Sequence, residues 1–137
     1  MGLIHLDAGV VIGFLDADDT HHQSAAQTLA ASLRSGDRLA MAASAFAECL
    51  VGPSRHGERA VATVSDLFER LPIDIVDLDA DTARRAAALR ARHASLRLPD
   101  ALVLATASEN SADHLITTDR RWPSKTKLEL RASIAVI

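Results

Sequence analysis

The sequence is poor in cysteine, aromatic residues and long apolar runs, and each shortage excludes a class of protein. Its single cysteine cannot form an internal disulfide and supplies too few thiolates for a zinc site. Aromatic residues make up only 3% of the chain, so stacking platforms for nucleic-acid bases are scarce. No apolar run is long enough to cross a membrane, and the N-terminus lacks the pattern of a signal peptide. We therefore expect a cytoplasmic protein without disulfides.

Positive charge is also in short supply. The formal net charge is −3, which argues against a protein that holds nucleic acid passively through a broad basic surface. An enzyme that gathers acids around a metal ion is compatible with this charge, because the ion cancels the local negative charge. The 48% hydrophobic content supplies a core, and the length fits one domain covering residues 1–137.

Short apolar runs alternate with longer segments of helical periodicity, which is typical of an α/β domain with a mainly parallel sheet. Strands are expected at residues 3–6, 39–41, 73–78, 114–117 and 133–137, and helices at 10–15, 20–33, 44–51, 58–71, 81–93 and 100–108. Gly52-Pro53 is expected to end the third helix, and Asp81 to cap the fifth. The prediction is a central sheet of about four to five strands flanked by helices.

Two acidic residues stand at the ends of predicted strands. Asp7 directly follows the first strand, and Asp119 lies two residues beyond Thr117, at the end of another. Ligands bind at the carboxyl ends of the strands in parallel sheets, so these acids converge if their strands are neighbours. Taken singly, each acid could instead cap the element that follows it.

Two further acids lie in apolar helical segments. Glu48 is the only charge in residues 45–51, where a buried carboxylate needs a compensating cation unless the helix turns it to solvent. Asp100 begins an almost wholly apolar helix, which predicts an interior position, although an acid there also suits the helix dipole. Clustered carboxylates repel one another, and all-oxygen ligands select Mg²⁺ or Mn²⁺. Such a site suits phosphodiester hydrolysis.

Together these segments resemble the PIN domain, in particular the VapC toxins of bacterial VapBC toxin–antitoxin pairs. The matching pieces are Asp7 after its strand, residues 44–48 leading into 51–53, residues 98–107, and residues 115–122. The Pro-Asp-Ala and Thr-x-Asp segments are the specific ones, and the resemblance covers essentially the whole chain. One departure is that the family usually has Thr or Ser after the first Asp, where this chain has Ala8-Gly9.

The resemblance implies an Mg²⁺- or Mn²⁺-dependent endoribonuclease that leaves a 5′-phosphate and a 3′-hydroxyl. It implies that Asp7 and Asp100 are direct metal ligands and that Glu48 and Asp119 complete the site, directly or through water. The resemblance also implies that Thr117 donates a hydrogen bond to this acidic site without binding the metal itself. The resemblance also implies a homodimer, and an antitoxin whose C-terminal segment blocks the active site.

Several basic residues are candidates for contact with RNA phosphates. Arg120 and Arg121 directly follow Asp119, within the segment that carries the resemblance. The other candidates lie in the fifth helix, in the loop after it and near the C-terminus: Arg84, Arg85, Arg90, Arg92, Arg97, Lys125 and Lys127. An exposed helix face and a charged loop would account for most of them equally well.

Two other functions compete with the nuclease. A phosphoacceptor domain also uses a strand-end Asp, but its phosphatase form needs a second Asp where this chain has Gly9, and its receiver form needs an adjacent acid pair that is not seen. A non-catalytic module that binds RNA or protein through the same fold is the other alternative. The presence of all four acids counts against it.

Overall fold

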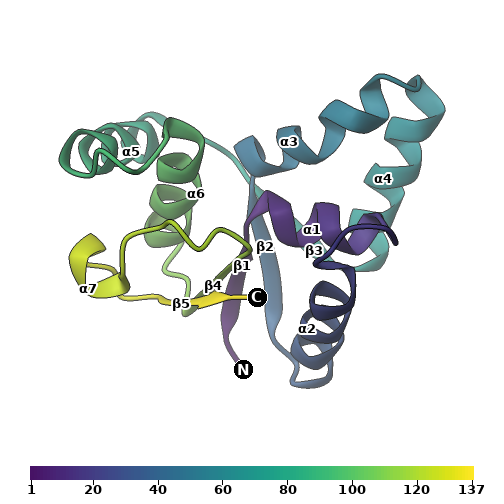
Figure 1. Cartoon of the computed structure of the whole chain (residues 1–137), viewed down its shortest axis with the longest axis horizontal. Helices are drawn as coiled ribbons and strands as arrows, with labels where there is room; N and C mark the ends of the chain where they lie inside the picture. Colours follow the sequence, from purple (N-terminus) through teal and green to yellow (C-terminus); the bar gives the residue numbers. More distant parts are fainter.

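Five parallel strands form one sheet, and helices cover both of its faces (Figure 1). The structure is a computed structural model that describes residues 1–137. The strands are β1 (Leu3–Leu6), β2 (Arg38–Ala42), β3 (Ile73–Val76), β4 (His114–Thr117) and β5 (Ser133–Val136). The helices are α1 (Ala8–Leu15), α2 (His22–Arg34), α3 (Ala43–Ser54), α4 (Glu58–Arg70), α5 (Ala80–Arg92), α6 (Leu98–Glu109) and α7 (Lys125–Leu128). The predicted α/β class and its parallel sheet are therefore confirmed.

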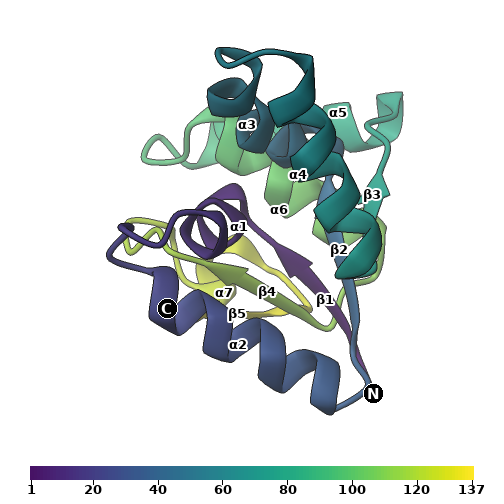
Figure 2. The ribbon, with the colours of Figure 1, turned by 90° about the vertical axis from the view of Figure 1, so that its right-hand side faces the viewer.

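The strand order β3-β2-β1-β4-β5 explains how the helices divide between the two faces. The chain moves across the sheet in one direction from β1 to β3, and then returns past β2 and β1 to form β4. Because the crossovers are right-handed, helices that connect strands in one direction across the sheet lie on one face, and helices that connect strands in the reverse direction lie on the other face. Accordingly, α1 to α4 lie on the right of the strands in Figure 1 and α5 to α7 on the left. Figure 2 views the first group directly, with α2 at one end and α3 and α4 at the other.

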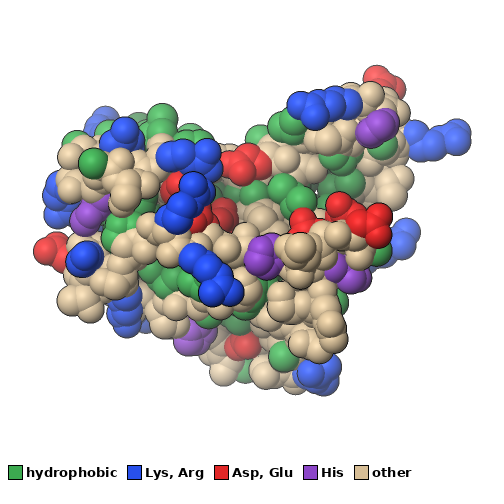
Figure 3. Space-filling model, viewed as in Figure 1, with side chains coloured by type: hydrophobic (Ala, Val, Ile, Leu, Met, Phe, Trp, Pro, Cys, Tyr) green, Lys and Arg blue, Asp and Glu red, His purple; other side chains and the backbone are tan.

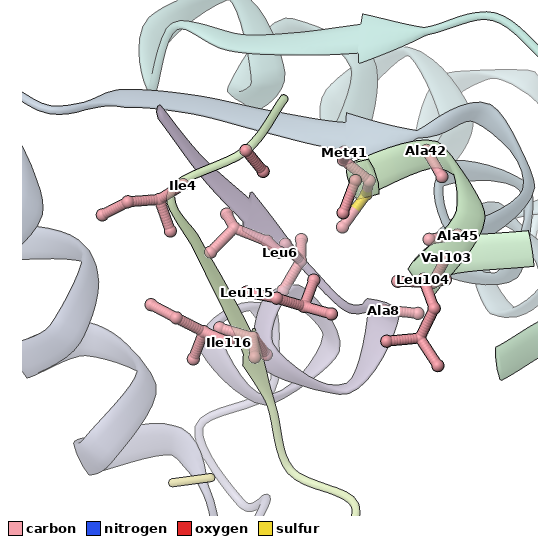
Figure 4. Close-up of a cluster of buried hydrophobic side chains, with 14 of the residues drawn as sticks. Ile4, Leu6, Ala8, Met41, Ala42, Ala45, Val103, Leu104, Leu115 and Ile116 are labelled. Carbon is pink, nitrogen blue, oxygen red and sulfur yellow. The ribbon is translucent and has the colours of Figure 1, made fainter. Parts of the chain in front are cut away.

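The centre of the core is built from the inner strands and α6. Leu6, Met41 and Leu115 are completely buried, and Leu104 of α6 points toward the same cluster (Figure 4). The expectation that the apolar α6 is buried is confirmed, because most of its residues have little or no exposed surface. No helix of the chain has both the length and the apolar composition needed to span a membrane. The core thus holds the start of α6 firmly against the sheet.

The predicted end of α3 and the predicted cap of α5 are wrong. Helix α3 continues through Gly52 and Pro53 to Ser54, because Gly52 does not have the positive φ with which a glycine ends a helix. A proline in the last turn costs only one hydrogen bond there, so the helix tolerates it. The cap of α5 is Asp79, whose carboxylate accepts a hydrogen bond from the Thr82 backbone N at 2.8 Å. Asp81 lies in the first turn of the helix and pairs with Arg84.

Candidate active site

The pairing of β1 with β4 brings Asp7 and Thr117 to the same edge of the sheet. Leu6 lies opposite Ile116, and the Asp7 backbone N donates to the Ile116 carbonyl at 2.9 Å. The Thr117 hydroxyl donates to Asp7 Oδ2 at 2.8 Å and accepts from the Asp119 backbone N at 3.0 Å. Thr117 therefore makes the hydrogen bond to Asp7 that the resemblance implied, and it connects the two acids.

Asp7 also caps the helix that follows it. Its Oδ1 accepts from the Ala8 backbone N at 2.8 Å, at the first turn of α1. The two interpretations of this residue, a cap and a site acid, are thus both consistent with its geometry. Each oxygen of the Asp7 carboxylate thus accepts one hydrogen bond, Oδ1 from the Ala8 backbone and Oδ2 from the Thr117 hydroxyl. These two bonds fix the orientation of the carboxylate.

Asp100 and Glu48 approach the same edge from helices on opposite faces. Asp100 lies in the first turn of α6 and is buried, as its sequence context predicts. Glu48 lies on α3 and is exposed, so of the two possibilities that the sequence left open, the helix turns this position to solvent. Its helix turns the side chain outward, while the apolar residues around it, such as Ala45 and Cys49, pack inward.

The charges of the four acids act on one another. Burial raises the pKa of Asp7, hydrogen bonds from Thr117 and Ala8 oppose that rise, and the charges of Asp100 and Asp119 add to it. Partial removal of the Glu48 carboxylate from water raises its pKa, and the charges of Asp7 and Asp100 raise it further. Although Glu48 is an exposed residue, its carboxylate is close enough to both aspartates to interact with their charges. The four acids therefore form one electrostatically connected group.

Two arginines lie over this acidic group. Arg121 Nε and Nη2 bind the two carboxylate oxygens of Asp119, each at 3.1 Å, and the Arg121 backbone N donates to Oδ1 at 2.8 Å. Arg97 Nε lies 3.6 Å from Asp100 Oδ2. Asp7 and Glu48 have no such basic partner. Figure 3 shows acidic and basic side chains together beside the hollow that separates the α3–α4 arm from α5 and α6.

The kind of donor at this edge fits a hard divalent cation. All four side chains offer carboxylate oxygens, the ligands that Mg²⁺ and Mn²⁺ prefer. Burial raises the pKa of Asp7 and of Glu48, and the charges of neighbouring aspartates add to the rise; a cation would favour the ionised form of both. In the present side-chain positions, however, no three Asp, Glu, His or Cys residues are arranged to hold one ion. Arg121 binds both oxygens of Asp119, so Oδ2, which accepts a single hydrogen bond, is the oxygen of this carboxylate with a lone pair left for a cation or a water molecule.

The Ala8-Gly9 departure has a structural counterpart in Thr118. A Cβ at position 9 would overlap the Thr118 hydroxyl oxygen, which therefore occupies the space that a side chain at Gly9 would need. Thr118 stands between Thr117 and Asp119, so this hydroxyl lies at the edge of the acidic group. No pattern in the sequence marks Thr118, because its proximity to Gly9 depends on the pairing of β1 with β4.

A comparison with known proteins identifies the family. A model of the PIN domain matches residues 4–128. The chain belongs to the PIN domain family. No curated protein matches the sequence significantly.

Solved structures share this PIN fold. A chain of a toxin–antitoxin complex from Klebsiella pneumoniae is 24% identical, with a TM-score of 0.67 over 85% of this chain and 86% of that one. A chain of VapBC2 from Rickettsia felis, bound to a promoter DNA fragment, is 15% identical, with a TM-score of 0.74 over 98% of each chain. Mycobacterium tuberculosis VapC20, a toxin that cleaves the sarcin–ricin loop, is 17% identical, with a TM-score of 0.66 over 82% of this chain and 86% of that one.

The packing of Thr118 on Gly9 predicts a pair of compensating substitutions. Gly9→Ala should destabilise the fold by about 1–3 kcal/mol, the usual cost of overpacking, because the new methyl group overlaps the Thr118 hydroxyl. Thr118→Ala removes that hydroxyl, so the double variant should recover most of the stability. Denaturant titration of the four proteins measures both effects. Equal stability of Gly9→Ala and the parent would show that the two residues do not interlock.

The Arg121–Asp119 pair predicts a change in titration. The Arg121 guanidinium holds the pKa of Asp119 below its ordinary value, so Arg121→Ala should raise it. The Arg121–Asp119 pair stabilises the fold fully at pH values above the ordinary pKa of a carboxyl group. This stabilisation is lost as the pH falls through the lowered pKa of Asp119. Carboxyl chemical shifts followed by NMR against pH measure the change. Arg120→Ala is the matched control, since Arg120 forms no ion pair; an identical Asp119 titration in both variants would contradict the assignment.

Proposed function

We propose that this chain is an Mg²⁺- or Mn²⁺-dependent endoribonuclease that hydrolyses RNA phosphodiesters at the edge formed by Asp7, Asp100, Asp119 and Glu48. The observation that carries the proposal is the electrostatic connection of these acids at the carboxyl ends of β1 and β4. A purely structural role gives no reason for such a group, because like charges repel one another and Asp7 and Glu48 have no ion-pair partner. A cation that binds RNA phosphate is the compensation that fits both the ligands and the family.

Each residue has a separate part in this proposal. Asp7 and Asp100 are the metal ligands, and Glu48 and Asp119 complete the site directly or through water. A bound Mg²⁺ or Mn²⁺ supplies a water molecule of lowered pKa and offsets negative charge on the phosphate. Thr117 fixes the Asp7 carboxylate through its 2.8 Å hydrogen bond. Arg121, when released from Asp119, is placed to bind a phosphate oxygen, and Arg120 extends the same basic loop.

We further propose that the enzyme is the toxin of a type II toxin–antitoxin pair. Support comes from its membership of the PIN family and from its fold, which it shares with chains of several toxin–antitoxin complexes. The partner would be a cognate antitoxin that blocks the acidic edge, and the active form a cytoplasmic homodimer. An RNA-cleaving relative with the same fold, VapC20, makes RNA the expected substrate class.

Substitution of the two proposed ligands tests the enzymatic part. With Mg²⁺ or Mn²⁺ the purified chain should cleave RNA, and EDTA should stop the reaction. Asp7→Asn and Asp100→Asn should reduce cleavage to background, because an amide keeps the shape of the carboxylate but carries no charge. Cleavage products resolved on sequencing gels measure this effect, and circular dichroism checks that the variants fold.

Asp81→Asn is the matched control for this experiment. Asp81 is also an aspartate in the first turn of a helix, but it is exposed and pairs with Arg84, outside the acidic group. The Asp81→Asn variant should therefore cleave RNA at the same rate as the parent protein. If the Asn variants at positions 7 and 100 cut as fast as the control, the proposed site is wrong; if no protein cuts any RNA, the chain is a non-catalytic PIN module.

A further inference from the structure

A cavity lies beside the acidic group, and Arg121 contacts both. It has a volume of about 470 Å³ and lies between the end of α5, the loop that follows, and the segment from Arg121 into α7. The lining residues that matter here are Arg92, His93, Ser95, Arg121, Trp122 and Lys127. Because Arg121 also binds Asp119, this residue connects the cavity lining with the candidate active site.

The lining of this cavity is basic although the whole chain is acidic. It contains three permanent cations, Arg92, Arg121 and Lys127, and no acidic residue, whereas the chain has a net charge of −3. Lys127 has no ion-pair partner, and Arg92 has only a long contact of 3.7 Å with Glu129, an exposed residue outside the lining. In Figure 3, basic side chains predominate in the left-hand part of the surface, over α5 to α7. A hollow whose lining holds several cations and no acid favours a polyanion as the occupant.

The cavity also offers aromatic surface. Trp122, the only tryptophan of the chain, lines it, and the Trp122 indole N–H is buried without a hydrogen-bond partner. His93 also lines the cavity and provides a second ring. Cations that alternate with aromatic rings are the usual means of binding single-stranded nucleic acid, because phosphates meet the cations and bases stack on the rings.

We propose that this cavity binds the single-stranded RNA backbone next to the phosphate that is cleaved, with Lys127 and Arg92 contacting phosphates and Trp122 and His93 contacting a base. The proposal rests on the nuclease function for the identity of the ligand. An acidic peptide of a partner protein is the other polyanion to consider. The observations favour RNA, since the lining carries aromatic rings beside its cations and shares Arg121 with the acids that would hydrolyse a phosphodiester.

Lys127 and Lys125 provide a matched pair for the test. Both are exposed lysines of the short helix α7, but only Lys127 lines the cavity. The probe is a labelled single-stranded RNA oligonucleotide of mixed sequence, with EDTA present to prevent cleavage. Fluorescence anisotropy gives the affinity at a series of salt concentrations, and emission from Trp122 reports directly on occupation of the cavity.

Lys127→Ala and Arg92→Ala should each weaken RNA binding several-fold and lower the slope of log affinity against log salt by about 0.7 for each phosphate that the variant no longer neutralises. Lys125→Ala should leave affinity, slope and the Trp122 response at parental values. If Lys127→Ala and Arg92→Ala behave like Lys125→Ala, the cavity does not bind RNA and the inference is overturned. It is also overturned if a polyglutamate peptide occupies the cavity, judged by Trp122 emission, and RNA does not displace it.

The two proposals fail separately. If the parent never cleaves RNA with either metal but the lysine pair still differs as expected, the nuclease function is wrong and the RNA-binding cavity stands. If cleavage occurs and depends on Asp7 and Asp100 while the lysines are equivalent, only the cavity assignment is wrong.

Discussion

The parallel pairing of β1 with β4 is the constraint on which the candidate site depends. It places Leu6 opposite Ile116, so the residues that follow both strands meet at one edge of the sheet. The Thr117 hydroxyl can then donate to Asp7 and accept from the Asp119 backbone with good geometry at both distances. A shift of register by one residue would turn Thr117 to the opposite face and separate the two acids.

Charge balance is the second constraint on this edge. Asp100 and Asp119 each have an arginine beside them. Asp7 is stabilised by hydrogen bonds instead, and Glu48 is exposed to solvent. The arginines therefore have two kinds of partner, the protein's own acids and the phosphates of a substrate. We interpret the acids and arginines as one system, in which a cation that binds the carboxylates frees the guanidinium groups for RNA.

Much of this arrangement could be predicted from the sequence, because it depends on local patterns. The strand-end positions of Asp7 and Asp119 and the burial of Asp100 at the start of an apolar helix were all evident. The exposure of Glu48 was not, since apolar neighbours do not fix which way one helical position faces. The contact of Thr118 with Gly9 and the basic cavity between α5 and α7 also escaped prediction, because they depend on tertiary placement. The Arg97–Asp100 pair has the i, i+3 spacing that could have signalled it.

Titration with Mn²⁺ followed by NMR tests the central claim, that the four acids form one cation site. The unpaired electrons of Mn²⁺ broaden the signals of nuclei near the ion. The backbone amide signals around Asp7, Asp100 and residues 117–119 should disappear early, followed by those near Glu48, while the C-terminal half of α2 and residues 35–38, at the opposite edge of the sheet, remain sharp. Early broadening of the acidic loop at residues 16–19 instead, or no localised broadening at all, would contradict the central claim.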